Sequence, residues 1–192
     1  MSRLRRTAAV SIAAFGALAL AAVTAGTANA GTVTSGTVTL TINDSYLSTL
    51  HNNNIDVVPT GAASVTDSNG MTTVVYNATG GDANLSIGIG HVDYAGGLTV
   101  RDESTNQSVQ LSSLQFDVFN NQFDAAPSGG SEVALVDPAG PFNTTIGGSP
   151  TTFTAGGLVI DAAGASYLNS TLGTTRFQAG QNIGSFATTV SD

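Results

Sequence analysis

The stretch Val109-Gln-Leu-Ser-Ser-Leu-Gln-Phe-Asp-Val118 indicates the fold class of this chain. Apolar and polar side chains alternate along it, which is typical of a strand with one face in a protein core. The alternation slips by one position at Ser112-Ser113, where one extra residue would restore the inward face. We therefore predict a bent strand with a β-bulge at these two serines.

Two other stretches have the same period. Apolar residues alternate with threonines over 38–42, and with serine and glycine over 85–89, and Ser68-Asn69-Gly70 is a strong hairpin signal. Only 9% of the residues are charged, and Thr, Val, Ser and Gly dominate. We predict an all-β fold: a single β-sandwich-like domain with bulged antiparallel strands and one or two short helical turns. Its predicted core is Leu40, Ile42, Leu85, Ile87, Ile89, Leu111, Leu114, Phe116, Val118, Leu158 and Ile160.

Two distant segments resemble each other. Leu40-Thr-Ile-Asn-Asp-Ser-Tyr-Leu-Ser-Thr-Leu50 is echoed by Leu158 to Leu172, which also contains Ser-Tyr-Leu before further leucines. Each predicts a strand, a short helical turn (46–50 and 166–172) and a further strand (55–61 and 177–180). Such short helices need a partner, so we expect them at the mouth of the sheet, with the first and last strands close together. Chance similarity in a sequence rich in Ser, Thr and Leu is the alternative.

The first thirty residues have the three parts of a secretory signal peptide. Basic residues (Arg3, Arg5, Arg6) precede the apolar run 8–23, and Ala28-Asn29-Ala30 forms a small-x-small cleavage site. We predict domain boundaries of 1–30 for the signal peptide and 31–192 for one β-rich extracellular domain. The protein is then secreted, with retention at the cell surface left open, and is not inserted in a membrane after cleavage.

The charge balance excludes several partners. After cleavage the chain keeps two basic residues, Arg101 and Arg176, against thirteen acids, and it contains no lysine and no cysteine. Nucleic acids and anionic membranes require clustered basic side chains, so neither is an expected partner. Disulfides and cysteine nucleophiles are impossible.

The order of these features resembles the HtaA-type domains of actinobacterial haem-uptake systems and their secreted relatives. The resemblance rests on Asp93-Tyr-Ala-Gly-Gly-Leu98, Val109-Gln-Leu111 and Leu168-Asn-Ser-Thr-Leu-Gly173. It implies a β-domain fold and a haem-type ligand. Tyr94 stands where the family pattern has a histidine, and the Trp-Gly element of haem-binding members is missing because the chain has no tryptophan.

Catalytic patterns are weak. The chain has no Gly-x-Ser-x-Gly elbow, and its two histidines, His51 and His91, lack zinc-site spacing. A glycoside hydrolase could use two of the acids Asp117, Asp124, Glu132 and Asp137, but carbohydrate sites favour aromatic platforms that are scarce here. The turns around 67–70 and 80–84 offer oxygen ligands without the loop of an EF-hand, so we predict no metal site.

We therefore expect a secreted, non-catalytic domain that contacts extracellular proteins, the envelope or itself. The first alternative is an HtaA-like carrier of haem or another ligand, and the second is a carboxylate-dependent glycoside hydrolase. If a ligand binds, the candidate residues are His91 and Tyr94, because histidine and tyrosine are both workable haem ligands. In a regular strand these two side chains point to opposite faces, so only a bulge would bring them together. Otherwise we expect no cofactor.

Overall fold

A computed structural model describes residues 29–145 and 148–191 of the chain. The predicted signal peptide, 1–30, lies outside the described residues except for Asn29 and Ala30. The predicted cleavage therefore stays a prediction.

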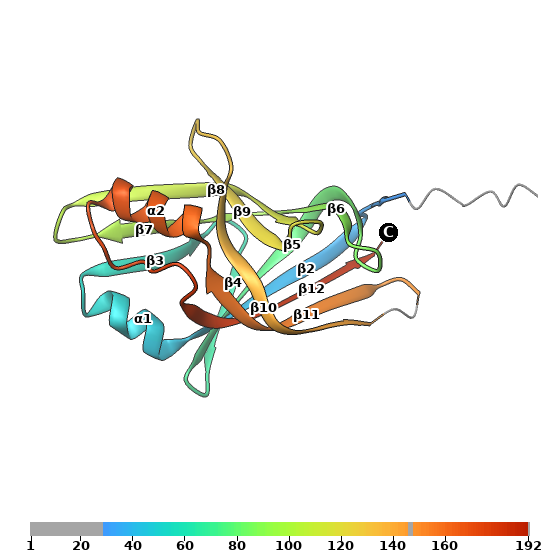
Figure 1. Ribbon diagram of the computed structural model, residues 1–192, viewed down its shortest axis with the longest axis horizontal. Helices are drawn as coiled ribbons and strands as arrows, with labels where there is room; N and C mark the ends of the chain where they lie inside the picture. Colours follow the sequence, from blue (N-terminus) through green and yellow to red (C-terminus); the bar gives the residue numbers. More distant parts are fainter. Residues whose placement is uncertain (1–28, 146–147, 192) are drawn as a thin grey trace, which may run out of the picture.

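The described residues form twelve strands and two helices (Figure 1). In chain order these are β1 (Gly31–Thr32), β2 (Ser35–Asn43), α1 (Asp44–His51), β3 (Ile55–Thr60), β4 (Ser64–Ser68), β5 (Met71–Asn84), β6 (Ile89–Tyr94), β7 (Gly97–Asp102), β8 (Gln107–Asp117), β9 (Gln122–Pro127), β10 (Val133–Thr145), β11 (Thr151–Ile160), α2 (Ala162–Leu172) and β12 (Asn182–Ser191).

The strands close into a barrel, which corrects the predicted sandwich. All pairs are antiparallel, and the ring runs β5-β2-β12-β11-β10-β9-β8-β6 and back to β5. The short strand β6 closes the ring, because it pairs with the second half of β5 on one side and with the second half of β8 on the other. A sandwich would leave these edges open. The all-β class is confirmed, but the arrangement in two separate sheets is wrong.

Local predictions from turn and bulge chemistry are confirmed. The register of β8 against β9 shifts between Ser112 and Gln115, and Ser113 has a φ of 52°. The β4–β5 hairpin turns at Asn69 and Gly70, which have φ values of 54° and 75°. These left-handed conformations suit a two-residue hairpin turn.

The predicted strand over 85–89 is wrong. Residues 85–88 form the turn between β5 and β6, and only Ile89 belongs to a strand. The amides of Ile87 and Gly88 donate to the carbonyl of Asn84, and Gly88 has a φ of 70°. Asparagine and glycine thus stabilise a turn against the period-two pattern. Ile87 is consequently 47% exposed instead of lying in the core.

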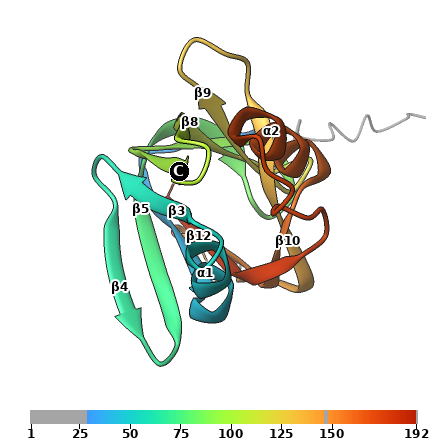
Figure 2. The ribbon, with the colours of Figure 1, turned by 90° about the vertical axis from the view of Figure 1, so that its left-hand side faces the viewer.

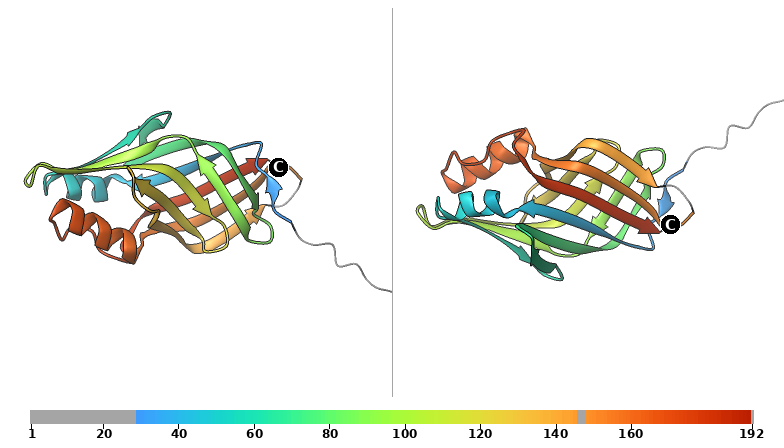
Figure 3. Two further views of the ribbon diagram at one scale, coloured as in Figure 1. Left: turned by 90° about the horizontal axis from the view of Figure 1, so that it is seen from above. Right: turned by 90° about the horizontal axis from the view of Figure 1, so that it is seen from below.

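Both predicted helical turns are confirmed, and both lie at one end of the molecule, which we call the helix end (Figures 1 and 3). The described C-terminus lies at the other end, which we call the closed end because β6 completes the ring there. The first and last long strands, β2 and β12, pair over eight residues, as expected. Residues 177–180 do not form the predicted strand; they belong to the connection between α2 and β12.

Aromatic side chains gather in the interior of the barrel. An aromatic cluster of Phe116, Phe123, Phe153 and Phe186 fills the barrel, with ring centroids of Phe116 and Phe186 4.8 Å apart. Of the predicted core, Leu85, Leu111, Leu114, Phe116, Val118, Leu158 and Ile160 are buried, whereas Leu40, Ile42 and Ile89 are only partly buried. Within the described residues, no helix is long and apolar enough to span a membrane.

Candidate ligand-binding site

The helix end contains an apolar cavity of about 130 Å³, which we call the helix-end cavity. Side chains from both helices and from most strands of the barrel line it, including Leu40, Tyr46, Val57, Leu98, Val136 and Leu168. Leucine, isoleucine, valine, phenylalanine, proline and tyrosine supply the whole lining. Apolar walls and concave shape are the usual features of a small-molecule site.

Incomplete burial of inward-facing residues marks this cavity. Leu40 and Ile42 alternate with outward threonines on β2, so they point into the barrel, yet both are only partly buried. Val57 and Leu98, which also line the cavity, are partly buried too. The predicted core positions Leu40 and Ile42 are therefore on the inner face, but the protein itself leaves the space beside them unfilled.

The helix α1 forms part of the wall of this cavity. Figure 2 looks onto the helix end, where α1 lies below β3 in the view. Its packing partners are β2 and β3, and Tyr46, Leu47 and Leu50 line the cavity. Leu50 is the buried residue of this helix. At its N-cap, Asn43 makes no side-chain capping hydrogen bond.

The helix α2 is attached more tightly. The carboxylate of Asp161 accepts a hydrogen bond from the amide of Ala163, and Gly173 ends the helix with a φ of 67°. Gly164 lies so close to β10 that a Cβ there would approach the Ala134 and Leu135 carbonyl oxygens to 2.7 Å. Small residues on this face allow the close approach.

Two tyrosines are the polar members of the lining. The Tyr76 hydroxyl, on β5, donates to the carbonyl oxygen of Gly97, on β7, at 3.0 Å, and burial raises the pKa of Tyr76 to about 12. Burial also raises the pKa of Tyr46, whose hydroxyl makes no hydrogen bond with another described residue. The sequence echo located Tyr46 on a helix, but nothing in the sequence placed it at a cavity.

Among the positive groups at the helix end, His51 is paired with an acid, and neither His51, Arg101 nor Arg176 lines the cavity. Nδ1 of His51 is 2.9 Å from Oδ1 of Asp56, and this hydrogen bond raises the pKa of His51. Arg101 lies opposite Asp56 in the β3–β7 register, on the face away from Val100, which lines the cavity. Hydrogen bonds from Ser104, with a contribution from the charge of Arg176, lower the pKa of Asp102.

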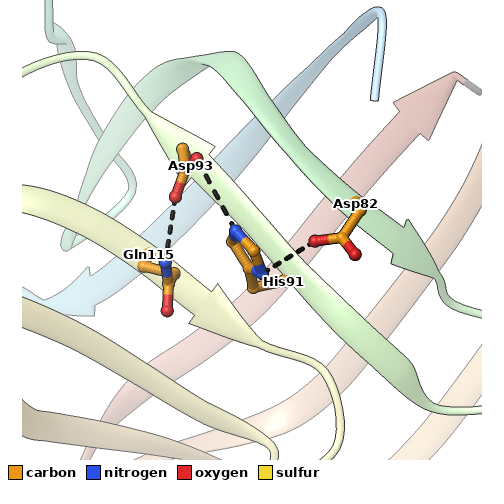
Figure 4. Close-up of polar contacts among 4 residues, drawn as sticks. All are labelled: Asp82, His91, Asp93 and Gln115. Carbon is orange, nitrogen blue, oxygen red and sulfur yellow. Dashed lines mark hydrogen bonds and ion pairs between the residues drawn. The ribbon is translucent and has the colours of Figure 1, made fainter. Parts of the chain in front are cut away.

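The predicted ligand residues His91 and Tyr94 lie on opposite faces of β6, and neither lines the helix-end cavity. Figure 4 shows His91 between two carboxylates on the outer face. Its Nδ1 lies 3.0 Å from Oδ1 of Asp82, its Nε2 lies 3.8 Å from Oδ2 of Asp93, and Gln115 donates to the other Asp93 oxygen at 3.0 Å. Both ring nitrogens thus face acids.

Tyr94 points into the barrel and is 4% exposed. Its hydroxyl lies 2.6 Å from the Thr188 hydroxyl, which itself donates to the carbonyl oxygen of Thr37. Tyr94 therefore donates to Thr188, and burial raises its pKa. The Tyr94 side chain thus belongs to a buried polar network, and the centroid of its ring lies 6.0 Å from that of Phe123.

The acids considered for glycoside hydrolysis lie outside the cavity. Asp117 caps the β8–β9 turn by accepting from the Asn120 amide at 2.9 Å, and Glu132 is exposed. Asp124 and Asp137 each have one buried oxygen without a hydrogen bond, and burial, then neighbouring carboxylates, raises both pKa values to about 6. Among the described residues, no group of three or more His, Asp or Glu is arranged to hold a metal ion.

The residues present do not fit haem, which the HtaA-type resemblance implied. His91 and Tyr94 are engaged elsewhere, and the cavity lining contains no histidine, methionine or cysteine. Of the two tyrosines in the lining, Tyr46 makes no hydrogen bond with a described residue, but its raised pKa disfavours the phenolate that binds iron. A volume of about 130 Å³ also lies below the roughly 300 Å³ of ordinary ligand pockets.

Comparison with known proteins identifies the fold. No protein-family model and no curated protein matches the sequence. The crystal structure of the C-terminal domain of HtaA from Corynebacterium glutamicum is similar, with a TM-score of 0.60 and 10% identity over 83% of this chain and 98% of that chain. The heme binding protein HtaB from the same organism gives a TM-score of 0.48 and 12% identity over 83% and 94% of the two chains. The predicted resemblance is thus confirmed at the level of fold: this chain folds like the C-terminal domain of HtaA.

Proposed function

We propose that this protein is a non-catalytic carrier that holds an apolar small molecule in the helix-end cavity. The observation that carries this proposal is the incomplete burial of inward-facing aliphatic residues, above all Leu40 and Ile42. Apolar surface left in contact with water costs roughly 25 cal/mol per Å². A ligand that covers these side chains recovers that free energy, so the cavity favours an apolar occupant.

The similarity of fold to the HtaA domain supports the carrier alternative more than it supports an enzyme. Contacts with extracellular proteins or the envelope would use a different surface from the cavity. Phe119 is 74% exposed in the β8–β9 turn and Ile87 is 47% exposed in the β5–β6 turn, both at the closed end. We also propose that the protein is exported: cleavage after Ala30 would make Gly31, the first residue of β1, the new N-terminus.

Binding is tested with indole as a small neutral fluorescent dye, because an apolar cavity of about 130 Å³ accommodates a molecule of nearly this size. The dye should bind saturably to the purified protein. Val57→Phe should abolish binding, because Val57 lines the cavity and the larger ring fills it. The matched control is Val58→Phe: this neighbour on β3 is 54% exposed, and it should bind dye like the native chain.

Two outcomes contradict the carrier proposal. One is the absence of saturable dye binding, and the other is equal binding by both phenylalanine variants; either would favour surface contacts. A parallel titration with hemin, followed by the Soret band, tests the haem alternative. If hemin binds and His91→Ala or Tyr94→Phe abolishes that binding, the ligand lies on β6 instead of in the cavity.

A further inference from the structure

We propose that the ligand of the helix-end cavity is an extended alkyl chain, which leaves the cavity between β3 and β4 and lies along Val65. This inference rests on the carrier function proposed above. It adds the shape of the ligand and the route by which the ligand enters.

The route follows from the way the strands pair at the helix end. The first half of β5 pairs with β4 and its second half with β6, while the first half of β8 pairs with β7 and its second half with β6. Beyond the end of β6, the barrel wall therefore continues as two branches, β5 with β4 and β7 with β3. Figure 2 shows the β4–β5 hairpin projecting away from the barrel. Among the described strands, β3 pairs with β7 alone and β4 with β5 alone, so each branch ends in a free edge. We call the place between these two edges, where no backbone pairing closes the wall, the side opening.

An apolar row leads from the cavity to the side opening. Leu40 on β2, Val74 on β5 and Val65 on β4 lie directly opposite one another, so their side chains share one face of the sheet. Leu40 and Val74 line the cavity, whereas Val65 does not and is 50% exposed. On the other side of the opening, Val57 and Pro59 of β3 also line the cavity and are only partly buried. The wall of the cavity thus continues outward as exposed apolar surface on β4.

This row is one side chain wide on β4. At the next position on the same face, a carboxylate oxygen of Asp67 lies 2.9 Å from the Thr72 hydroxyl, which is also 2.9 Å from a carboxylate oxygen of Asp44. On the other side, Ala63 belongs to the short connection between β3 and β4 and packs against the core. Alternate residues of a strand are roughly 7 Å apart. The row therefore accommodates a single alkyl chain over Val65, beside the polar group at Asp67.

The cavity and the row together favour a chain that is longer than the cavity. An apolar cavity of roughly 150 Å³ holds a benzene-sized molecule, so the helix-end cavity, at about 130 Å³, holds about six carbon atoms. Further CH₂ groups of a longer chain cover Val65, half of which is otherwise in contact with water. Each CH₂ group that loses about half of its own contact with water should raise the affinity about twofold.

The test compares hexan-1-ol, whose chain is about the size of the cavity, with decan-1-ol, which has four more CH₂ groups. Each alcohol is titrated against bound indole, whose emission is easily followed because the chain contains no tryptophan. We expect decan-1-ol to displace indole at a concentration about tenfold lower than hexan-1-ol does, since each added CH₂ group contributes about twofold.

The position of the chain is tested with Val65→Asp, which places a charge at the side opening. This variant should bind indole and hexan-1-ol like the native chain, because Val65 does not line the cavity. The advantage of decan-1-ol should fall to about threefold or less, because its added CH₂ groups then meet a carboxylate instead of an apolar side chain.

The matched control is Thr66→Asp. Thr66 is the next residue on β4, is also exposed, and lies opposite Thr73 on the other face of the sheet. This variant adds the same charge to the same strand, away from the apolar row, and should keep the native advantage of decan-1-ol.

The outcomes separate this inference from the carrier function. If indole binding is saturable and blocked by Val57→Phe, but the two alcohols displace indole equally well, the carrier function stands and the extended chain is wrong. If the advantage of decan-1-ol persists in Val65→Asp, or is lost equally in Thr66→Asp, the chain does not lie along Val65. A native dimer that Val65→Asp converts to a monomer in sedimentation velocity would mean that a second copy of the chain covers Val65, which would also overturn the inference. Absence of indole binding would contradict both proposals.

Discussion

The two helical segments have similar sequences and very different attachments. Both contain Ser-Tyr-Leu after a barrel strand, and both end up at the helix end (Figure 3). The helix α2 is capped by Asp161, terminated by Gly173 and buries Leu168 and Leu172. The helix α1 lacks a side-chain cap and buries Leu50. A shared motif therefore specifies a helix, while the surrounding contacts decide how firmly that helix is attached to the barrel.

The sharpest test of this difference uses the leucines at the echo positions. Leu168→Ala should lower the free energy of unfolding by about 2–4 kcal/mol, because Leu168 is 7% exposed and its removal enlarges the cavity beside α2. Leu47→Ala should lower it by about 1 kcal/mol or less, since Leu47 is only partly buried at the cavity. Urea unfolding measures both. Equal losses would mean that α1 is as firmly packed as α2.

Substitutions at the helix caps should change the free energy of unfolding less than the leucine substitutions do. Asp161→Ala should lower it by about 1 kcal/mol, because the Ala163 amide loses its acceptor. Asp161→Asn keeps an acceptor and removes a negative charge near Asp137, so it should be at least as stable as the native chain at pH 7. Asn43→Ala at α1 should change stability by less than about 0.5 kcal/mol. A larger loss at Asn43 than at Asp161 would reverse the comparison.

The smallest expected effect is a dependence of stability on pH, which comes from two acids near α2. Asp124 and Asp137, whose charge environment includes the Asp161 cap, have folded pKa values of about 6, above the roughly 3.9 of an unfolded chain. The folded state thus binds protons more tightly, and this stabilisation, complete below about pH 4, is lost as the pH rises through 6. The thermal midpoint should be roughly 2–4 °C higher at pH 5 than at pH 7.

The double variant Asp124→Asn with Asp137→Asn serves as the control for this pH effect. The hydrogen bond with Asp56 also raises the pKa of exposed His51, on α1. This pair therefore also makes the folded state more stable at low pH than at high pH. If the double variant keeps the full difference between pH 5 and pH 7, the effect comes from elsewhere, and the acids beside α2 are not its source.

Features that depend on neighbouring residues could be predicted from the sequence. The bulge at Ser112-Ser113 follows from a slip in the alternation, and the β4–β5 turn follows from Asn69-Gly70, which tolerate positive φ. The strand predicted over 85–89 failed for a related reason. Apolar and polar residues do alternate there, but Asn84 and Gly88 stabilise a turn, so these residues form a turn instead of a strand.

Features that depend on distant residues were decided by the tertiary structure. Alternation shows that Leu40 and Ile42 face inward, but whether other side chains reach them depends on where α1, β3 and β7 pack. Barrel closure depends on β6 pairing with both β5 and β8, and an alternating strand is the same in a sandwich as in a barrel. Periodicity and turn chemistry act locally, so an all-β chain with two short helices could be predicted from the amino-acid pattern. Closure, the cavity and the position of Tyr46 beside it required the fold, because they arise from contacts between residues far apart in the chain.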